Sequence, residues 1–427
     1  MTKFTHKLSK QVLGPSIRIL MLTLLVGFGA GAALAQTRGY VTNGSDNTVS
    51  VIDTATATVI ATIPVGLGPT EVAVTPNGRF VYVVNQFSKT VSVISAASNT
   101  VVATVPVGTF PASIAITPTG AFAYVASSPD SNLSVIDTAT NTVVTTVPTS
   151  FPFKLAIASS GNVGYLTHGA IVNGVDVINT ATNTVVANIP VPVEVTIAPA
   201  VTPNAAFVYV TCLSLTTSSR DPKIAVIDTA TNTVVAIVPL PAGAVPIGIA
   251  ITPNGAFAYI ANALSNSLSV IDTSTNTLFG SLPLGSAPTG IAVTPDGAFV
   301  YVTNAGDNTV SVVRTATNTV AAIVPVGTNP RGVAFGTLTE DTIESLIAQV
   351  EALIAGGTLT QNQGDGLIDK LEEAGAKITA GQTSAACIQL SAFINQVNGL
   401  INNGSLSSAQ GQALINAANA IKTKLGC

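Results

Sequence analysis

The stretch YVTNGSDNTVSVIDTATATVIATIPVG, from Tyr40 to Gly66, decides the fold because similar segments recur around six more tyrosines. The spacings between successive tyrosines are 42, 42, 41, 44, 50 and 42 residues. A period of about 40–45 residues with strand-like content is typical of the blades of a β-propeller. All seven tyrosines of the 427-residue chain occupy this one repeat position: Tyr40, Tyr82, Tyr124, Tyr165, Tyr209, Tyr259 and Tyr301.

One full unit, residues 70–107, shows how a blade is built. It contains four runs rich in Val, Ile, Thr and Tyr, namely TEVAVT, FVYVVN, TVSVIS and TVVATVPV. Segments with Pro, Gly, Asn or Ser follow these runs: PNG, QFSK, AASN and GTFP. This alternation predicts four antiparallel strands joined by tight turns. The runs are almost continuously apolar, which fits a sheet that is packed between two other sheets.

The two ends of the repeat region predict how the ring closes. The repeats begin with a second strand, GYVTN, and end with a lone first strand, PRGVAFG, at residues 330–336. The last strand can complete the first blade, so that seven blades close without a long exposed sheet edge. The predicted fold for residues 36–336 is therefore an all-β seven-bladed propeller with terminal-strand ring closure.

Residues 337–427 are predicted to form a small all-α domain of four helices. The composition shifts to Ala, Leu, Gln and Glu, and LIAQVEALIAGGTLTQNQGDGLIDKL from Leu346 aligns without gaps to FINQVNGLINNGSLSSAQGQALINAA from Phe393. Each half has a helix, a glycine stop and a second helix that opens with a capping box. These signals are Gly357 and Thr360–Gln363 in the first half, and Gly404 and Ser407–Gln410 in the second.

Both regions resemble known families. YVTN at 40–43 and 301–304, with the VIDTATNTV and P-x-G segments, is similar to the YVTN-family β-propeller repeat of exported and surface-layer-type proteins. AFINQVNGL, from Ala392 to Leu400, resembles the FIMAH domain, a helical module of secreted bacterial proteins. The first resemblance implies a scaffold that hosts unrelated activities. The second implies attachment to a protein or a carbohydrate.

Residues 1–35 are expected to be a secretory signal peptide. A basic start with Lys3, Lys7, Lys10 and Arg18 leads into an apolar run that ends in an A-x-A cleavage site at 33–35. A retained membrane anchor is the alternative, but the glycine-rich second half of the run lowers its hydrophobicity. Cleavage would give a secreted, periplasmic or cell-surface protein. No later segment is apolar for long enough to span a bilayer.

The charge of the chain argues against a nucleic-acid partner. Loss of the leader moves the net charge from −4 to −8, and no basic run remains. Charged residues make up only 8% of the chain, whereas about 25% is typical. Thr, Asn, Ser and Gly must therefore cover the surface. This exterior fits an exported protein, and the FIMAH resemblance implies a cell-envelope protein or carbohydrate as its partner.

The residue inventory favours a binding or surface-structural protein that is not an enzyme. A Ser-His-Asp or Cys-His site would need His168 as its base, but no companion motif accompanies His168, and in YLTH it is interpreted as a strand-end polar residue. No cofactor is indicated and no His/Cys metal cluster occurs. A calcium site of carboxylates and carbonyls stays open. The alternative is an extracellular enzyme of the lactonase or dehydrogenase kind, because propellers host such sites.

The aspartates of the VID segments are interpreted as turn residues rather than as a ring of ligands. An Asp that opens a DTATNT turn can bond to its own backbone. Two repeats carry Ser95 and Arg314 at this position, which a shared carboxylate site would not tolerate. The aspartates concerned are Asp53, Asp137, Asp228 and Asp272.

Two of the three cysteines are predicted to form a disulfide. Cys387 lies at the start of the third expected helix and Cys427 lies just beyond the fourth, so the two are neighbours in an antiparallel hairpin. Export favours oxidation, and two free thiols are the alternative. Cys212 replaces the Asn of YVTN and is interpreted as a buried structural thiol rather than a nucleophile.

Candidate binding residues gather on one face of the ring. The TPNG and DTATNT turns hardly vary between repeats, whereas the second-to-third and blade-to-blade loops of the opposite face do, and binding residues are often found in such loops. Neutral drift is the alternative. Phe151 and Phe153 add apolar area there, or else packing. The candidates are Glu71, Lys154, Glu194 and Arg331 near the central channel, Arg220, Asp221 and Lys223 in the longest loop, and His168.

Overall fold

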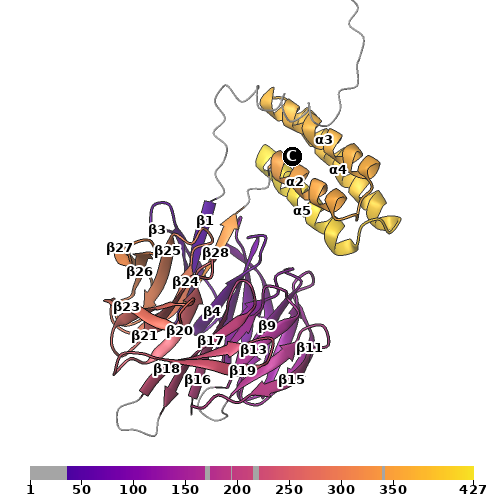
Figure 1. Ribbon diagram of the computed structural model, residues 1–427. Coiled ribbons are helices and arrows are strands. Elements are labelled where there is room, and N and C mark those ends of the chain that lie inside the picture. The colour runs from indigo at the N-terminus through magenta and orange to yellow at the C-terminus, as the bar shows by residue number, and fades with distance from the viewer. Residues whose placement is uncertain (1–35, 169–173, 194, 215–220, 339–341) are drawn as a thin grey trace, which may run out of the picture. The chain divides into compact units, whose positions relative to one another are not determined.

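The computed structural model describes residues 36–168, 174–193, 195–214, 221–338 and 342–427. Seven four-stranded antiparallel sheets are followed by four helices in these residues (Figure 1). The predicted seven-bladed propeller with a four-helix C-terminal domain is therefore confirmed.

Each blade is a meander of four strands, and six of the seven blades follow chain order. Blade 1 is formed by β28 (Pro330–Leu338), β1 (Gln36–Asn43), β2 (Thr48–Asp53) and β3 (Thr58–Pro64). Blades 2 and 3 are formed by β4 (Pro69–Val74), β5 (Phe80–Asn85), β6 (Thr90–Ser95), β7 (Thr100–Pro106), β8 (Pro111–Ile116), β9 (Phe122–Ser127), β10 (Asn132–Asp137) and β11 (Thr142–Pro148).

The remaining blades repeat this plan. Blades 4 and 5 are formed by β12 (Leu155–Ile157), β13 (Val163–Thr167), β14 (Val175–Asn179), β15 (Thr184–Ile189), β16 (Val195–Val201), β17 (Phe207–Ser214), β18 (Asp221–Asp228) and β19 (Thr233–Pro239). Blades 6 and 7 are formed by β20 (Pro246–Ile251), β21 (Phe257–Asn262), β22 (Ser267–Asp272), β23 (Thr277–Pro283), β24 (Pro288–Val293), β25 (Phe299–Asn304), β26 (Thr309–Arg314) and β27 (Thr319–Pro325).

The ring closes through the last strand of the propeller, as predicted. β28 pairs with β1 in antiparallel register from Gln36↔Leu338 to Val41↔Val333, and the two strands lie side by side in Figure 1. The strand runs to Leu338, two residues beyond the predicted end, because the chain before Tyr40 supplies partners for it. This pairing removes the edge that an incomplete blade would expose.

The two middle strands of each blade carry the core. In blade 2, every residue of β5 after Phe80 is buried, and so are the four inner residues of β6. Strand β7 is largely exposed. The middle strands are covered by a neighbouring blade on both faces, which explains their continuous apolar sequence. The outer strands carry the Thr and Val residues that face solvent.

The repeated tyrosine links neighbouring blades. The hydroxyl of Tyr82 in blade 2 donates to Oδ1 of Asn141 in blade 3 at 2.7 Å, and Asn141 has a φ of +55° in its DTATNT turn. Asn therefore serves both the left-handed turn and the bond between blades. The same bond joins Tyr124 to Asn183, Tyr209 to Asn276 and Tyr259 to Asn318.

The helical domain shows its internal duplication in its packing. Its helices are α2 (Ile343–Ala355), α3 (Gln361–Thr379), α4 (Thr383–Asn402) and α5 (Ser408–Leu425). Both predicted capping boxes form, at Thr360 and at Ser407. A Cβ on Gly364 would lie 2.1 Å from Cδ1 of Ile354, and the equivalent distance from Gly411 to Ile401 is 2.3 Å. Glycine at these two positions lets the isoleucines of the preceding helices pack closely.

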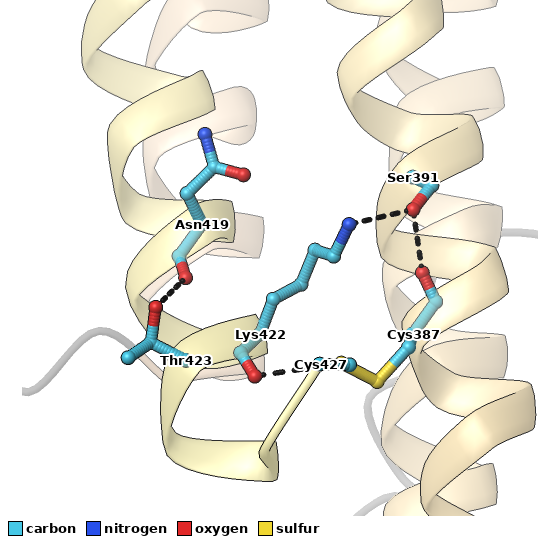
Figure 2. Close-up of a disulfide and its surroundings, with 6 residues drawn as sticks. All are labelled: Cys387, Ser391, Asn419, Lys422, Thr423 and Cys427. Carbon is cyan, nitrogen blue, oxygen red and sulfur yellow. Dashed lines mark hydrogen bonds between the residues drawn. A yellow bond between two sulfur atoms is a disulfide. The ribbon is translucent and has the colours of Figure 1, made fainter.

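A disulfide joins Cys387, near the start of α4, to Cys427, two residues beyond the end of α5 (Figure 2). Cys387 and Cys427 are 6.3 Å apart at Cα, as the sequence predicts for neighbouring helix ends. Beside it, the ammonium group of Lys422 donates to the hydroxyl of Ser391 at 2.8 Å, and that hydroxyl donates to the carbonyl of Cys387. The last turn of α5 is thus held to α4 by a covalent bond and a polar contact.

A search of the described helices for a membrane span finds none with the necessary length and hydrophobicity.

Candidate functional site at the channel mouth

The innermost strands of the seven blades stand next to one another around the propeller axis. Each contacts the next around a closed ring: β4, β8, β12, β16, β20, β24 and β28. Each of these strands begins with, or is preceded by, the pattern Pro-x-x-apolar. The third position of this pattern is therefore repeated around the mouth of the central channel.

Glycine and polar residues divide this ring into two arcs. Blades 6, 7 and 1 carry Gly248, Gly290 and Gly332. A Cβ on Gly290 would lie 1.9 Å from a backbone carbonyl oxygen of the next inner strand, and one on Gly248 would lie 2.5 Å from another. The strands approach too closely there for any side chain. We call the opposite side, with Glu71, Ser113 and Lys154 of blades 2 to 4, the polar arc.

An ion pair spans the polar arc. Nζ of Lys154 lies 2.5 Å from Oε2 of Glu71, and the two side chains are 24% and 19% exposed. The pair reaches from blade 4 to blade 2 across the first strand of blade 3. Ser113 of that strand is buried, and its hydroxyl accepts a hydrogen bond from the Leu155 amide at 3.3 Å. A charge-assisted bond of this kind fixes both side chains at the channel mouth.

Arg331 adds a second cation at the border of the polar arc. It precedes Gly332 in β28, which lies next to β4 of blade 2. Oε1 of Glu71 is 2.9 Å from the place that a Cβ of Gly332 would take, so the carboxylate covers this glycine. The Arg331 side chain is exposed, and its Nε is 3.3 Å from the corresponding position at Gly44. The mouth thus carries the Glu71–Lys154 pair and, on the neighbouring strand β28, the cation of Arg331.

Threonines of the YVT segments hold the inner strands in place. Oγ1 of Thr303 in blade 7 donates to the Arg331 carbonyl of blade 1 at 2.7 Å. Oγ1 of Thr42 in blade 1 accepts from the Gly332 amide at 2.8 Å and donates to the carbonyl of Thr70 in blade 2. These bonds preorganise the backbone that carries Glu71 and Arg331. These contacts were not predicted from the sequence, although the recurrence of Thr in YVT is a visible signal.

His168 belongs to the interior of blade 4 and not to the polar arc. Its Nδ1 contacts the Ser150 carbonyl, and its Nε2 lies 3.3 Å from Oδ1 of Asp176. The Asp176 carboxylate also accepts from Nδ2 of Asn188 and Oγ1 of Thr149, both at 2.8 Å. His168 and Asp176 are both buried, so this pair is a structural contact inside the blade.

The two buried groups set each other's pKa. Burial lowers the pKa of His168, but the hydrogen bond and charge of Asp176 outweigh burial and raise this pKa above its ordinary value. Burial raises the pKa of Asp176, but its contacts with His168, Asn188 and Thr149 outweigh burial and lower this pKa. Both charged forms are therefore favoured inside the blade.

The other blades show what His168 and Asp176 replace. In blade 1, Nδ2 of Asn43 donates to Oγ of Ser50 at 2.9 Å, and the same Asn–Ser contact occurs in blades 2, 6 and 7. Blade 4 changes both residues, and blade 5 changes them to Cys212 and Ala225. His168 was a candidate from the sequence and Asp176 was not, although comparison of the repeats shows that Asp176 replaces the recurrent Ser.

Cys212 is a free, buried thiol. Burial raises its pKa to about 12, so the thiolate that a nucleophile needs is scarce at neutral pH. This agrees with its interpretation as a structural residue.

The remaining candidates lie elsewhere. Nζ of Lys223 lies 2.8 Å from Oδ2 of Asp221 at the start of β18, so these two residues pair with each other. Glu194 and Arg220 lie outside the described residues. The VID aspartates are turn residues as interpreted, since each accepts a bond from an amide two residues on: Asp53 from Ala55, Asp137 from Ala139, Asp228 from Ala230 and Asp272 from Ser274.

Solved structures with the same fold include proteins of different function. The chain is similar to the hydrazine synthase of Kuenenia stuttgartiensis, with 25% identity, a TM-score of 0.61, and coverage of 65% of this chain and 92% of that one. A functionally unknown protein from Desulfotomaculum acetoxidans DSM 771 has 18% identity, a TM-score of 0.60 and coverage of 70% and 98%. The dihydro-heme d1 dehydrogenase NirN, in complex with DHE, has 15% identity, a TM-score of 0.53 and coverage of 73% and 78%. No curated protein matches the sequence.

Two families match the sequence. The FIMAH domain matches residues 343–423, as the resemblance implied. The family described as "Lactonase, 7-bladed beta-propeller" matches residues 35–153 and 201–338. This match contradicts the expectation that the chain is not an enzyme. That expectation rested on the single histidine, the absence of Trp and the lack of a metal motif. Since the second match covers more than half of the chain, the protein belongs to the lactonase family of seven-bladed β-propellers.

Proposed function

We propose that the propeller hydrolyses a cyclic ester at the channel mouth. The observation that carries this proposal is the Glu71–Lys154 ion pair in the polar arc, with Arg331 on the neighbouring strand β28. Membership of the lactonase family supports the same chemistry. Hydrolysis of an ester by water needs a base for the water and positive charge for the oxygen that becomes an anion.

Glu71 is the group that can act as the base. Oε2 of its carboxylate is held by Lys154, so the carboxylate is oriented. Oε1 lies over Gly332, on the glycine side of the mouth, and this glycine has no side chain to cover it. A water molecule bonded to Oε1 would transfer a proton to Glu71 as its oxygen adds to the ester carbonyl carbon.

The two cations complete the reaction. The carbonyl oxygen becomes an oxyanion, which the ammonium of Lys154 stabilises as the negative charge develops. The carbon–oxygen bond of the ring then breaks, and the ring oxygen takes the proton back from Glu71 as it leaves. One lactone and one water thus give one hydroxy acid. The guanidinium of Arg331 suits the product carboxylate, because it can bind both oxygens.

We also propose that this activity is exported. The expected signal peptide at 1–35 supports secretion to the periplasm, the cell surface or the medium. The FIMAH match supports a role for the helical domain in attachment to a cell-envelope protein or carbohydrate. The propeller would then act at a surface where the helical domain holds it.

A screen of γ- and δ-lactones tests the catalytic proposal, with acid release followed at constant pH. Glu71→Gln keeps the size of the side chain and removes the base, so kcat should fall by about 10²- to 10⁴-fold. Asp221→Asn is the matched control, because it also removes a carboxylate that is paired with a lysine, away from the polar arc. Equal loss in both variants, or no hydrolysis of any lactone by the intact chain, would contradict the proposal.

A further inference from the structure

Large apolar side chains are exposed on the loops that lead to the polar arc. Leu67 precedes β4, Phe110 precedes β8 and Phe151 follows blade 3, and they are 56%, 48% and 38% exposed. Phe87, in the loop between β5 and β6, is 63% exposed. We call these four residues the apolar shelf. Exposed apolar side chains that gather beside a polar site often mark a binding surface.

The members of the shelf in blades 2 and 3 contact one another. The Phe87 amide donates to the Leu67 carbonyl at 3.1 Å, and a Cβ on Gly68 would lie 2.4 Å from the Phe87 ring. The rings of Phe87 and Phe110 meet edge to face, with centroids 6.2 Å apart. The loop that carries Phe110 is held in place, because the carboxylate of Asp130 accepts a hydrogen bond from the Thr109 amide at 2.5 Å. The shelf is therefore preformed.

Backbone strain singles out two of these residues. Phe110 and Phe151 each have a φ of +46°, in the left-handed region that a bulky side chain rarely adopts. Other blades place Gly68, Ala287 or Asn329 at the same point, directly before the proline. Asn accounts for ten of the seventeen described non-glycine residues with positive φ. Since the two rings remain exposed, packing alone does not account for Phe, and strain of this kind is typical of functional sites.

The shelf is continuous with the polar arc. Phe110 lies three residues before Ser113, and Phe151 lies three residues before Lys154. Gly68, which Phe87 covers, lies three residues before Glu71. Loops of blades 2 to 4 thus carry both the shelf and the polar arc. A ligand with its polar end at Glu71 and Lys154 would extend an apolar end over these loops.

We propose that the apolar shelf binds an apolar substituent of the ester, so that the substrate is a lactone with an alkyl chain or an aromatic ring attached. This inference rests on the proposed hydrolysis. The occupant follows from charge and continuity: Lys154 and Arg331 match the oxyanion and carboxylate at the ester end, while the shelf matches the uncharged remainder. Burial of each methylene group should raise kcat/KM by about fourfold, until the chain passes the shelf.

The test compares δ-lactones with no side chain and with alkyl side chains of two, four and six carbons. Phe110→Asn combined with Phe151→Asn removes the two strained rings, and Asn329 shows that Asn fits this backbone position. This double variant should hydrolyse the unsubstituted lactone as the wild type does, and should lose the gain with chain length. It should also unfold at the same or a higher temperature, because strain is relieved. Ile323→Thr, on the exposed face of β27, is the control and should keep the chain-length gain.

Binding of alkyl-substituted δ-lactams, measured by calorimetry, separates this inference from the proposed hydrolysis. A lactam resists hydrolysis, so its affinity reports on binding to the shelf and not on catalysis. If no lactone is hydrolysed but lactam affinity rises with chain length in the wild type and not in the double variant, binding by the shelf is supported and the proposed hydrolysis is refuted. If lactones are hydrolysed at rates that do not depend on chain length, the proposed hydrolysis is supported and binding by the shelf is refuted. Equal lactam affinity in wild type and variant overturns the shelf in either case.

Discussion

Exchange of the buried pair in blade 4 gives a sharp test of how the repeat tolerates change. His168→Asn alone leaves the Asp176 carboxylate buried without a cation. Adding Asp176→Ser restores the Asn–Ser contact that blades 1, 2, 6 and 7 use. The single variant should therefore be much less stable than the double variant, although it contains fewer changes.

The structure sets the size of this effect. Removing one partner of a buried ion pair costs about 3–5 kcal/mol in general. Asp176 keeps its bonds to Asn188 and Thr149, which places the expected loss for His168→Asn near the lower end. The double variant loses both charges together, so its free energy of unfolding should be within about 1 kcal/mol of that of the wild type. Since Asp176→Ser alone is also destabilising, the coupling energy between the two sites should then exceed about 2 kcal/mol.

The pH dependence has a definite sign. The pKa of His168 is raised in the folded state, so its contribution is complete below about pH 6.5 and is lost as the pH rises through the folded value. The pKa of Asp176 is lowered, so its contribution is present above about pH 3.9 and is lost as the pH falls through the folded value. The pair should stabilise the protein most between these limits.

Urea unfolding at several pH values, followed by circular dichroism, measures both effects. From pH 6 to pH 9 the wild type should lose stability relative to the double variant, which lacks both titrating groups. A stability difference that does not change with pH would contradict the ion pair. So would a His168→Asn variant as stable as the double variant.

Three further predictions concern the architecture. Tyr259→Phe removes the bond to Asn318 between blades 6 and 7 and should lower the unfolding free energy by about 1–2 kcal/mol, and no change in urea midpoint would show that the bond is dispensable. Deletion of residues 330–338 removes β28, so the protein should aggregate or show a much lower melting temperature in calorimetry. An unchanged melting temperature would show that the ring does not need this strand. Replacing Cys387 and Cys427 by Ser should destabilise the helical domain by about 4 kcal/mol in the chain-entropy model, whereas an unchanged urea midpoint would refute this.

The fold could be predicted because the pattern of one blade recurs seven times in the sequence. Each Tyr marks a middle strand, and the register of GYVTN and PRGVAFG at the two ends is enough to predict closure of the ring. The extension of β28 to Leu338 was missed, because its partners, Gln36 to Arg38, carry no strand pattern of their own. Local pattern therefore determines the blades and leaves their ends imprecise.

The site could be predicted only in part. The start of each inner strand repeats, which is enough to place Glu71, Lys154 and Arg331 near the channel. Their arrangement depends on which blades carry glycine and on how far a lysine reaches, so the contact between Glu71 and Lys154 is not visible in the sequence. The non-enzyme expectation, which relied on the single histidine and the lack of a metal motif, is contradicted by the family match.

A double-mutant cycle on kcat/KM between Glu71 and Lys154 tests the central claim most directly, with the full chain and the best lactone from the screen. If the two side chains act as one catalytic unit, Glu71→Gln, Lys154→Met and the double variant should each lower kcat/KM by a similar factor of about 10² or more, since effects within a unit are not additive. Wild-type rates in all three variants, with lactone hydrolysis intact, would show that the chemistry takes place elsewhere on the propeller.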